Sequence, residues 1–264
     1  MDIKSYVLHQ KELLKKEVSE LKVTPSFVII QVNDDPASNA YVKGKIKDAN
    51  EVGTKVELRK FDSAISEEEL INEVDKVNND PSIHGLIVQM PLPKHINEER
   101  IKLAVNPKKD IDGFHPMSEL SPCTPKGIID YLKSESFDFI GKNALVIGRS
   151  NIVGKPMAKL LLKEHCNVTI VHSRTKREDM EMYVSHADVI VIAIGKTAFL
   201  DDTFKYKPTA VIVDVGINRT EEGLKGDALK DLPVYLQTPV PGGVGLLTRL
   251  TLLKNLMDAY KAEI

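Results

Sequence analysis

The chain has 264 residues, of which 42% are hydrophobic and 28% are charged, and its formal net charge is -2. This composition suits a globular protein of one large or two modest domains, and the balanced charge gives no general attraction for nucleic acid or an anionic membrane. Two distant cysteines indicate no disulfide framework, and no apolar run has the length of a signal-peptide core or a membrane span. We therefore expect a cytoplasmic protein that binds neither nucleic acid nor membrane.

The first half of the chain alternates between helical and strand patterns. The expected elements, in order, are a helix over 3–21, a strand over 26–32, a helix from an N-cap at Ser38 to Val52, a strand over 55–61, a helix over 67–77, a strand over 85–89 and a helix over 98–105. Such alternation predicts a parallel sheet with helices on its faces.

Residues 106–116, NPKKDIDGFHP, are rich in Pro, Gly and Asp, and we interpret them as a linker. A second alternation follows, with a helix over 125–132, strands over 144–147, 168–171, 189–194 and 210–215, and a last helix over 245–261. The near-continuous Val/Ile runs are typical of strands buried on both faces. We predict an α/β protein of two domains. A catalytic domain with a parallel sheet comprises 1–120 and 244–264, and a Rossmann-like domain comprises 121–243. The first domain includes 244–264 because we expect the last helix to return to it.

The segment 143–157, NALVIGRSNIVGKPM, reads as a strand, a tight turn and the start of a helix. Free N–H groups and the helix dipole make such a helix start suitable for binding a phosphate. Its spacing departs from the dinucleotide fingerprint Gly-x-Gly-x-x-Gly, because Ser150 stands where the second glycine is expected. This segment alone is a moderate indication of a nucleotide site.

The next predicted strand ends at His172-Ser-Arg-Thr, where NAD-binding domains usually place an acidic residue. Ser173 and Arg174 would instead pair with a 2′-phosphate, and Arg149 would reach the same group. This pattern favours NADP over NAD. The alternative is that Lys176, Arg177 and their neighbours are solvated charges at a strand end.

Tyr41 and Lys45 are four residues apart on a predicted helix and therefore lie on one face. Such a pair is also common as a tyrosine at a core edge beside a solvated lysine. Gln89 ends a buried strand, where α/β sheets present functional groups. Asp110 and Asp112 lie in a loop just before the second half, so we expect these groups to border a ligand site.

Six segments of the chain form a recognisable set: DDPASNAYVKGK (34–45), GLIVQMPLP (85–93), KDIDGFHP (109–116), PCTPKG (122–127), GRSNIVGKP (148–156) and TPVPGGVG (238–245). Together they resemble the bifunctional methylenetetrahydrofolate dehydrogenase/cyclohydrolase family. Their order and their spread over nearly the whole chain make the resemblance specific.

The resemblance implies a cytoplasmic homodimer that acts on tetrahydrofolate derivatives in one-carbon metabolism and purine biosynthesis. With NADP it would oxidise 5,10-methylenetetrahydrofolate to the methenyl form and then hydrolyse that to 10-formyltetrahydrofolate. Lys45 would be the catalytic lysine, Tyr41 would stack on the aminobenzoyl ring, Gln89 would pair with the lysine and Asp112 would bind the pterin. The resemblance also implies substrate contacts at Pro241, Gly242 and Gly243, and cofactor contacts at Gly148, Arg149, Ser150, Val153, Gly154, Ser173, Arg174, Gly195 and Ile217.

Two departures from the family pattern stand out. Only residues 117–121 separate GFHP from PCTPKG, where the family usually has a longer, Gly-rich segment. After PGGVG the chain continues Leu246-Leu-Thr-Arg249 instead of Pro-Met-Thr. Arg249 would lie in the first turn of the last helix, where the dipole disfavours a cation. We interpret it as a solvated side chain, with a contact to a substrate carboxylate as the alternative.

Two competing functions remain open at this point. One is another two-domain NADP enzyme of shikimate-dehydrogenase type, and the other is a nucleotide-binding homologue with one or both activities reduced. The histidines are scattered, with no pair at the spacing of metal ligands, so we expect no metal site. Cys123 and Cys166 are expected to be packing residues.

Overall fold

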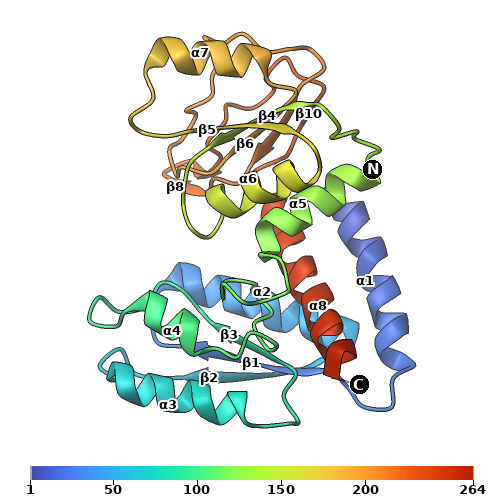
Figure 1. The fold of residues 1–264 in the computed structure, drawn as a ribbon, viewed down its shortest axis with the longest axis vertical. Coiled ribbons are helices and arrows are strands. Elements are labelled where there is room, and N and C mark those ends of the chain that lie inside the picture. The colour runs from blue at the N-terminus through green and yellow to red at the C-terminus, as the bar shows by residue number, and fades with distance from the viewer. Residues whose placement is uncertain (1, 264) are drawn as a thin grey trace. The chain divides into compact units, whose positions relative to one another are not determined.

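The computed structural model describes residues 2–263, which form two compact units. One unit contains residues 8–123 and the chain from 249 onward, and the other contains residues 2–7 and 124–248. Each has a parallel β-sheet between layers of helices (Figure 1). The predicted two-domain α/β fold is therefore confirmed. Within residues 2–263, none of the helices combines the length and the apolar character needed to cross a bilayer.

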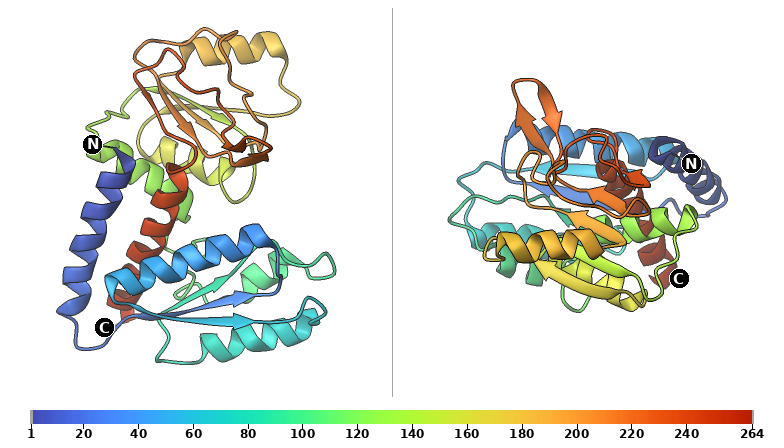
Figure 2. Two further views of the ribbon diagram at one scale, coloured as in Figure 1. Left: turned by 180° about the vertical axis from the view of Figure 1, so that it is seen from behind. Right: turned by 90° about the horizontal axis from the view of Figure 1, so that it is seen from above.

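In the unit that contains 8–123, three parallel strands have the order β2-β1-β3. They are β1 (Ser26–Gln31), β2 (Lys55–Lys60) and β3 (Gly85–Val88), and the helices are α2 (Pro36–Val52), α3 (Glu67–Asn78) and α4 (Glu98–Ala104). The greater parts of α1 (Ile3–Ser19) and α8 (Val244–Glu263) also belong to this unit. α3 and α4 pack on one face of the sheet, where Val28, Leu70 and Ile101 share a core. α2 lies on the other face (Figures 1 and 2).

The N-terminus of α2 differs from the prediction. Asp35, not Ser38, is the N-cap, and its side chain accepts the backbone N–H of Ser38 at 2.8 Å. Pro36 occupies the first helical turn, where its missing N–H costs nothing. The helix therefore begins two residues before Ser38, because an Asp-Pro pair makes a complete helix start. Gly53 ends the helix in the left-handed conformation, as predicted.

Residues 106–116 are not a linker. Lys109, Asp110 and Ile111 are buried, and Asp110 forms a parallel bridge with Leu86 of β3. The ammonium of Lys109 donates to two backbone carbonyl oxygens, that of Val77 at 3.1 Å and that of Asp80 at 2.6 Å. The prediction failed because it assumed that polar residues stay in solvent, whereas here the fold supplies each buried polar group with partners.

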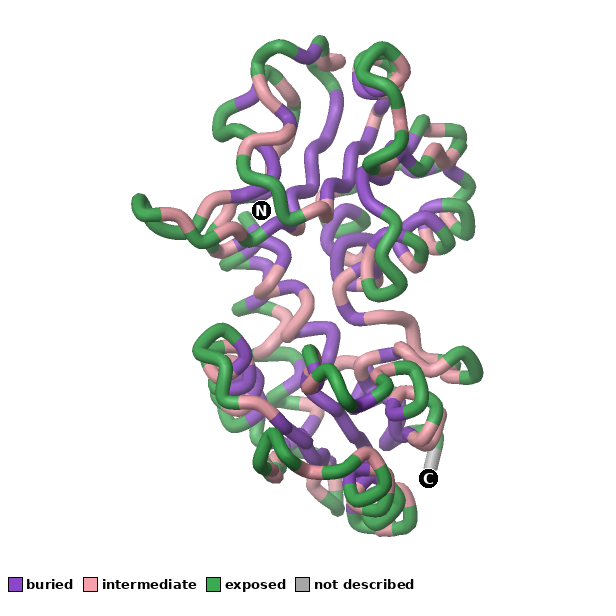
Figure 3. The backbone as a smooth tube through the Cα atoms, turned by 90° about the vertical axis from the view of Figure 1, so that its left-hand side faces the viewer, coloured by how far each residue is buried: buried purple, intermediate pink, exposed green. Residues whose placement is uncertain are grey.

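The second unit has five parallel strands in the order β10-β7-β6-β4-β5. Its strands are β4 (Asn143–Ile147), β5 (Asn167–Val171), β6 (Val189–Ile192), β7 (Val211–Asp214) and β10 (Leu236–Gln237), and its helices are α5 (Cys123–Ser134), α6 (Gly154–Lys163) and α7 (Arg177–His186). α7 packs on one face of the sheet, and Figure 1 shows α5 and α6 on the other. β6 and β7 are buried throughout and β4 at all but its first residue, and Figure 3 colours such buried backbone purple.

Three short strands were not predicted. β8 (Asn218–Thr220) and β9 (Gly223–Lys225) form an antiparallel hairpin that stands apart from the five-stranded sheet (Figure 2). β10 has only two residues and pairs with β7. These segments are short and partly exposed, so they lack the apolar run that identifies a buried strand.

Candidate active site

Helix α2 presents Tyr41 and Lys45 on one face, as their spacing predicts. Only 4% of the surface of Lys45 is exposed, so the side chain lies among protein atoms rather than in solvent. The ammonium lies 5.1 Å from the centroid of the Tyr41 ring. The solvated-lysine alternative is thereby excluded, because burial of an amine requires partners that offset its lost hydration.

Lys45 finds those partners on two other segments. Its Nζ donates to Oε1 of Gln89 at 3.2 Å, and it lies 3.8 Å from Oδ1 of Asp112. The Gln89 amide is held from its other side, because Nε2 donates to the carbonyl oxygen of Met90 at 2.8 Å. This second bond directs the acceptor oxygen of Gln89 toward the lysine. The structure therefore brings together all four residues that were expected to act on the folate.

Asp112 belongs to a tight turn built around the neighbouring carboxylate. Asp110 accepts backbone N–H groups from Gly113 at 3.1 Å and from His115 at 2.7 Å. Burial raises the pKa of Asp110 to about 6, and the charge of Asp112 adds to that shift, while the N–H donors oppose it. Gly113 has φ of +75° and a Cβ there would lie 2.6 Å from the carbonyl carbon of Ser121, so the turn requires glycine.

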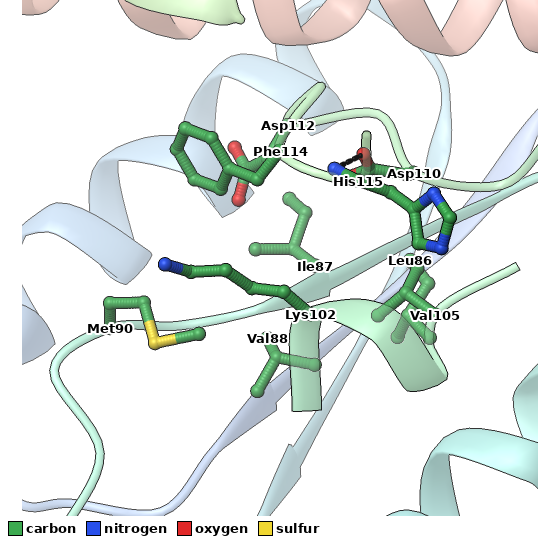
Figure 4. Close-up of a pocket in the computed structure, with 10 residues that line it drawn as sticks. All are labelled: Leu86, Ile87, Val88, Met90, Lys102, Val105, Asp110, Asp112, Phe114 and His115. Atoms are coloured by element: carbon green, nitrogen blue, oxygen red, sulfur yellow. Dashed lines mark hydrogen bonds between the residues drawn. The ribbon is translucent and has the colours of Figure 1, made fainter. Parts of the chain in front are cut away.

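A small cavity of ≈ 20 Å³ lies beside this turn, between β3 and α4. Asp110, Asp112 and Lys102 are among the residues that line it, and Figure 4 shows the hydrogen bond from the backbone of His115 to Asp110. A cavity of this size has room for about one water molecule. Polar groups on its wall give such a water hydrogen-bond partners beside the lysine–carboxylate cluster.

The interpretation of Arg249 as a solvated side chain is wrong. Its Nε lies 2.7 Å from Oδ2 of Asp48, a carboxylate whose side chain is only 4% exposed. The contact is an ion pair rather than a hydrogen bond, because the N–H is not aligned with the carboxylate oxygen. Lys11 of α1 binds the other oxygen of the same carboxylate at 2.5 Å. The guanidinium also lies over Gly44, where an added Cβ would be 2.2 Å from Nη1. Since α8 begins at Val244, Arg249 lies in its second turn, and the objection from the helix dipole does not apply.

In the other unit, the predicted nucleotide loop follows β4, which lies between β6 and β5 at the point where the strand order reverses. That point is where open α/β sheets bind their ligands. Gly148 has φ of +123°, and a Cβ would lie 2.6 Å from the carbonyl oxygen of Ala193. A Cβ on Gly154 would lie 2.4 Å from the carbonyl oxygen of Gly148. Both glycines are therefore required, Gly148 by close packing against the residue that follows β6 and Gly154 by close packing of the turn on itself.

Ser150 has a role that the sequence did not indicate. Its hydroxyl accepts the backbone N–H groups of Val153 at 3.1 Å and Gly154 at 3.2 Å, and its carbonyl oxygen accepts that of Lys155. Pro156 has no N–H to offer. The donors at the start of α6 are thus already used within the loop, so a phosphate at this position depends on side chains more than on the helix start.

Such side chains lie at the ends of β4 and β5. Arg149, Ser173 and Arg174 are all exposed. Arg177, by contrast, stacks on Phe204 with its guanidinium carbon 3.9 Å from the ring centroid, and it also binds Glu181. Of the basic residues that follow β5, Arg177 therefore does not fit a role in cofactor binding.

The loop that contains Gly195 is built around a second buried carboxylate, that of Asp227. Its two oxygens accept the backbone N–H groups of residues 194–196 at 2.7, 3.0 and 2.7 Å, and the side-chain amide of Asn218 at 2.9 Å. Ile217, which precedes Asn218, is 59% exposed. Asp227 therefore joins the loops after β6 and β7, which carry two of the predicted cofactor contacts.

Asp214, at the end of β7, lies behind Asp227 and accepts the backbone N–H groups of Gly216, Asp227 and Ala228. Burial raises its pKa to about 6. Gly216 and Gly226 leave the space for the two carboxylates, since a Cβ at either position would overlap one of them. Sequence reasoning missed this pair, because its only sequence signal is an Asp near a Gly in each of two separate loops.

Pro241, Gly242 and Gly243, the predicted substrate-binding loop, lie in the same unit as the nucleotide loop. Gly242 has φ of +91°, and a Cβ on Gly243 would lie 2.2 Å from the carbonyl oxygen of Pro239. Both cysteines are buried, as predicted for packing residues. Over residues 2–263, no three His, Cys, Asp or Glu side chains converge in a way that would hold a metal ion.

A parallel sheet whose first strand, β4, runs through a close-packed glycine turn into α6 is typical of a dinucleotide-binding domain, which places the chain among two-domain α/β proteins of the nicotinamide-nucleotide class. Residues 122–264 match the family model "Tetrahydrofolate dehydrogenase/cyclohydrolase, NAD(P)-binding domain", and residues 1–112 match its catalytic-domain counterpart. The chain belongs to the tetrahydrofolate dehydrogenase/cyclohydrolase family, as its motifs predicted.

Relatives and solved structures agree with this assignment. The chain is 45% identical to the bifunctional protein FolD of Streptococcus thermophilus, over 98% of this chain and 96% of the relative, and 43% identical to that of Bacillus subtilis, over 100% and 98%. It superposes on the bifunctional enzyme FolD of Campylobacter jejuni with a TM-score of 0.95, at 38% identity over 99% and 98% of the two chains. A shikimate dehydrogenase of Aquifex aeolicus, 19% identical over 90% and 92% of the chains with a TM-score of 0.50, shares only the fold.

Proposed function

We propose that this protein oxidises 5,10-methylenetetrahydrofolate to the methenyl form with NADP and then hydrolyses that product to 10-formyltetrahydrofolate. The observation that carries the proposal is the cluster of Lys45, Gln89 and Asp112 around one buried ammonium. Membership of the family and the names of the FolD relatives support it. The shikimate-type alternative has no such support, because the likeness there is one of fold alone.

In the hydrolysis, a water oxygen bonds to the cationic methenyl carbon and loses a proton. The bond from that carbon to one folate nitrogen then breaks as this nitrogen takes up a proton and the new hydroxyl loses its remaining proton, which leaves a formyl group on the other nitrogen. We assign to Lys45 the task of holding the water and carrying the proton at Nζ, with Gln89 fixing the amine in place. Tyr41 would stack on the aminobenzoyl ring beside the lysine, and Asp112 would accept two hydrogen bonds from the pterin.

In the oxidation, bound NADP supplies the hydride acceptor, and the residues of this chain orient the folate and the cofactor. The donor set suits a cofactor with a 2′-phosphate, because Arg149, Ser173 and Arg174 are exposed at the strand ends and no acidic residue stands among them. We assign the remaining cofactor contacts to Gly148, Ser150, Val153, Gly154, Gly195 and Ile217, and further substrate contacts to Pro241, Gly242 and Gly243.

We assign folate binding to residues 1–120 and 244–264, and NADP binding to residues 121–243. We also propose that the protein works in the cytoplasm as a homodimer and supplies one-carbon units for purine biosynthesis. β5 lies at one end of its sheet and exposes Ile170, and Leu162 of the neighbouring α6 is also exposed. These apolar side chains at an open sheet edge support association of two copies. Light scattering coupled to gel filtration measures the mass in solution.

The central test is the variant Lys45→Met, assayed separately for reduction of NADP with methylenetetrahydrofolate and for hydrolysis of methenyltetrahydrofolate. We expect hydrolysis to fall by at least about 100-fold, the usual scale for loss of a positioned proton-transfer group. Lys43→Met, at an exposed position of the same helix, is the matched control. Hydrolysis by Lys45→Met at the wild-type rate would remove Lys45 from the reaction. Tight NADP binding by the wild type without formation of NADPH would indicate the homologue with reduced activity.

A further inference from the structure

Helix α8 contacts the loop that carries Asp112 through one buried amide. Asn255 is 0% exposed, and its Nδ2 donates to the carbonyl oxygen of Ile111 at 2.9 Å and to that of Ser121 at 3.0 Å. Ile111 directly precedes Asp112, and Ser121 ends the short segment that replaces the family's longer loop. One side chain therefore closes the loop at both of its ends.

Cys123 makes two contacts at the same place. Its Sγ donates to the carbonyl oxygen of Ile111 at 3.2 Å, and its backbone N–H donates to that of Asp112 at 3.3 Å. Gly113 allows the two ends of the loop to approach, as its lack of a Cβ permits contact with Ser121. The backbone on both sides of Asp112 is thus held, whereas Met117 near the tip of the loop is 75% exposed.

The other end of the Asn255 amide is not satisfied. Its Oδ1 is buried and has no hydrogen-bond partner among the described residues. A buried acceptor without a partner is unfavourable, and an apolar side chain of similar shape would avoid that cost. The presence of an amide at this position is therefore explained by the two carbonyl oxygens that its Nδ2 binds, rather than by packing alone.

We propose that Asn255 is a positioning residue for substrate binding, which acts by holding the backbone of residues 111–121 so that the Asp112 carboxylate faces Lys45. This inference rests on the role proposed above for Asp112. It also explains how a loop that lacks the family's usual length keeps Asp112 in place, since α8 supplies the restraint from outside the loop. Asn255 itself does not touch the reacting atoms in this account.

The test compares the full-length variants Asn255→Leu and Asp112→Ala. We expect Asn255→Leu to raise the KM for methylenetetrahydrofolate about tenfold, the scale of a small misplacement of a binding group, and to leave the KM for NADP within about twofold. Thr251→Val, a buried change one turn earlier on α8, is the matched control for disturbed packing. A general packing defect would instead affect both substrates in Asn255→Leu and in the control alike.

Cys123→Ala provides a second variant in case Asn255→Leu does not fold, and we expect it to raise the folate KM about threefold, because one of the two donors to Ile111 is lost. If both variants bind folate as the wild type does while Asp112→Ala binds it weakly, the inference is overturned and the role of Asp112 stands. If Asp112→Ala itself leaves the folate KM unchanged, the role proposed for Asp112 falls, and this inference falls with it.

Discussion

Replacement of Arg249 by methionine tests whether the departure from the family pattern at this position contributes to stability. Asp48 lies between two cations, with Lys11 at 2.5 Å from one oxygen and Arg249 at 2.7 Å from the other. Methionine keeps an unbranched apolar stem over Gly44 but removes the guanidinium. The variant therefore leaves a buried carboxylate with one partner in place of two.

The magnitude follows from burial and from the partner that remains. At an effective dielectric constant of about 20, two unit charges 2.7 Å apart attract by roughly 6 kcal/mol before desolvation is subtracted. Removal of one partner from a fully buried pair costs about 3–5 kcal/mol. Lys11 still neutralises Asp48 in the variant, so we expect a loss of about 2 kcal/mol in the free energy of unfolding.

Urea unfolding of Arg249→Met, Asp48→Asn and the double variant measures this loss and the coupling between the two residues. Lys261→Met is the matched control, because Lys261 joins α8 to another helix, α1, through an ion pair with Glu17, but its side chain is 55% exposed. We expect the control to cost less than about 0.5 kcal/mol. A coupling energy between Arg249 and Asp48 below about 0.5 kcal/mol would show that the pair contributes nothing beyond an exposed contact, and the reasoning would be wrong.

Three further predictions concern pH, a glycine and the cofactor. Burial raises the pKa values of Asp110 and Asp214 from the ordinary 3.8 to about 6, so the folded state binds these protons more tightly than the unfolded state does. The free energy of unfolding should therefore rise by about 1 kcal/mol per group as the pH falls from 7 to 5, and a flat profile in urea titrations would contradict this. Gly226→Ala should lower the free energy of unfolding of the NAD(P)-binding unit by about 3 kcal/mol, because the added Cβ would lie 1.9 Å from Oδ2 of Asp214. Thermal unfolding measures this loss, and wild-type stability of the variant would show that the Asp214 carboxylate can move away. Arg174→Ala should lower the preference for NADP over NAD about tenfold in kcat/KM, and an unchanged ratio would exclude Arg174 from the 2′-phosphate site.

The sequence predicted the parts of this fold that depend on long apolar patterns. Strands such as β1 and β6 are buried on both faces and were located to within one or two residues. The N-cap of α2 was misplaced, because Ser38 and Asp35 are both good caps and the preference of Pro36 for the first helical turn, which selects Asp35, was not considered. The β8–β9 hairpin was missed because its strands have three residues each and none of these residues is buried.

The sequence predicted which residues form the candidate site, but it did not predict the residues that hold them in place. Spacing placed Tyr41 and Lys45 on one helix face, and motif resemblance added Gln89 and Asp112. Neither approach indicates that Asp48 and Asn255 are buried and hold other segments, because their partners are distant in sequence or are backbone carbonyl oxygens. The segment 106–116 was misread for the same reason, since polar composition does not reveal whether the fold will satisfy a buried charge.

Helix α8 takes part in both of these unpredicted contacts and so connects them to the candidate active site. Arg249 binds Asp48, which lies three residues after Lys45 on α2, and Asn255, six residues farther along α8, binds the carbonyl oxygen that precedes Asp112. Lys45 and Asp112, whose side chains lie 3.8 Å apart, therefore belong to two segments that are both held by α8. A displacement of α8 would change that contact from both sides, so losses of folate affinity in Arg249→Met and Asn255→Leu should not add independently. Additive effects in the double variant would show instead that α2 and the Asp112 loop are positioned separately.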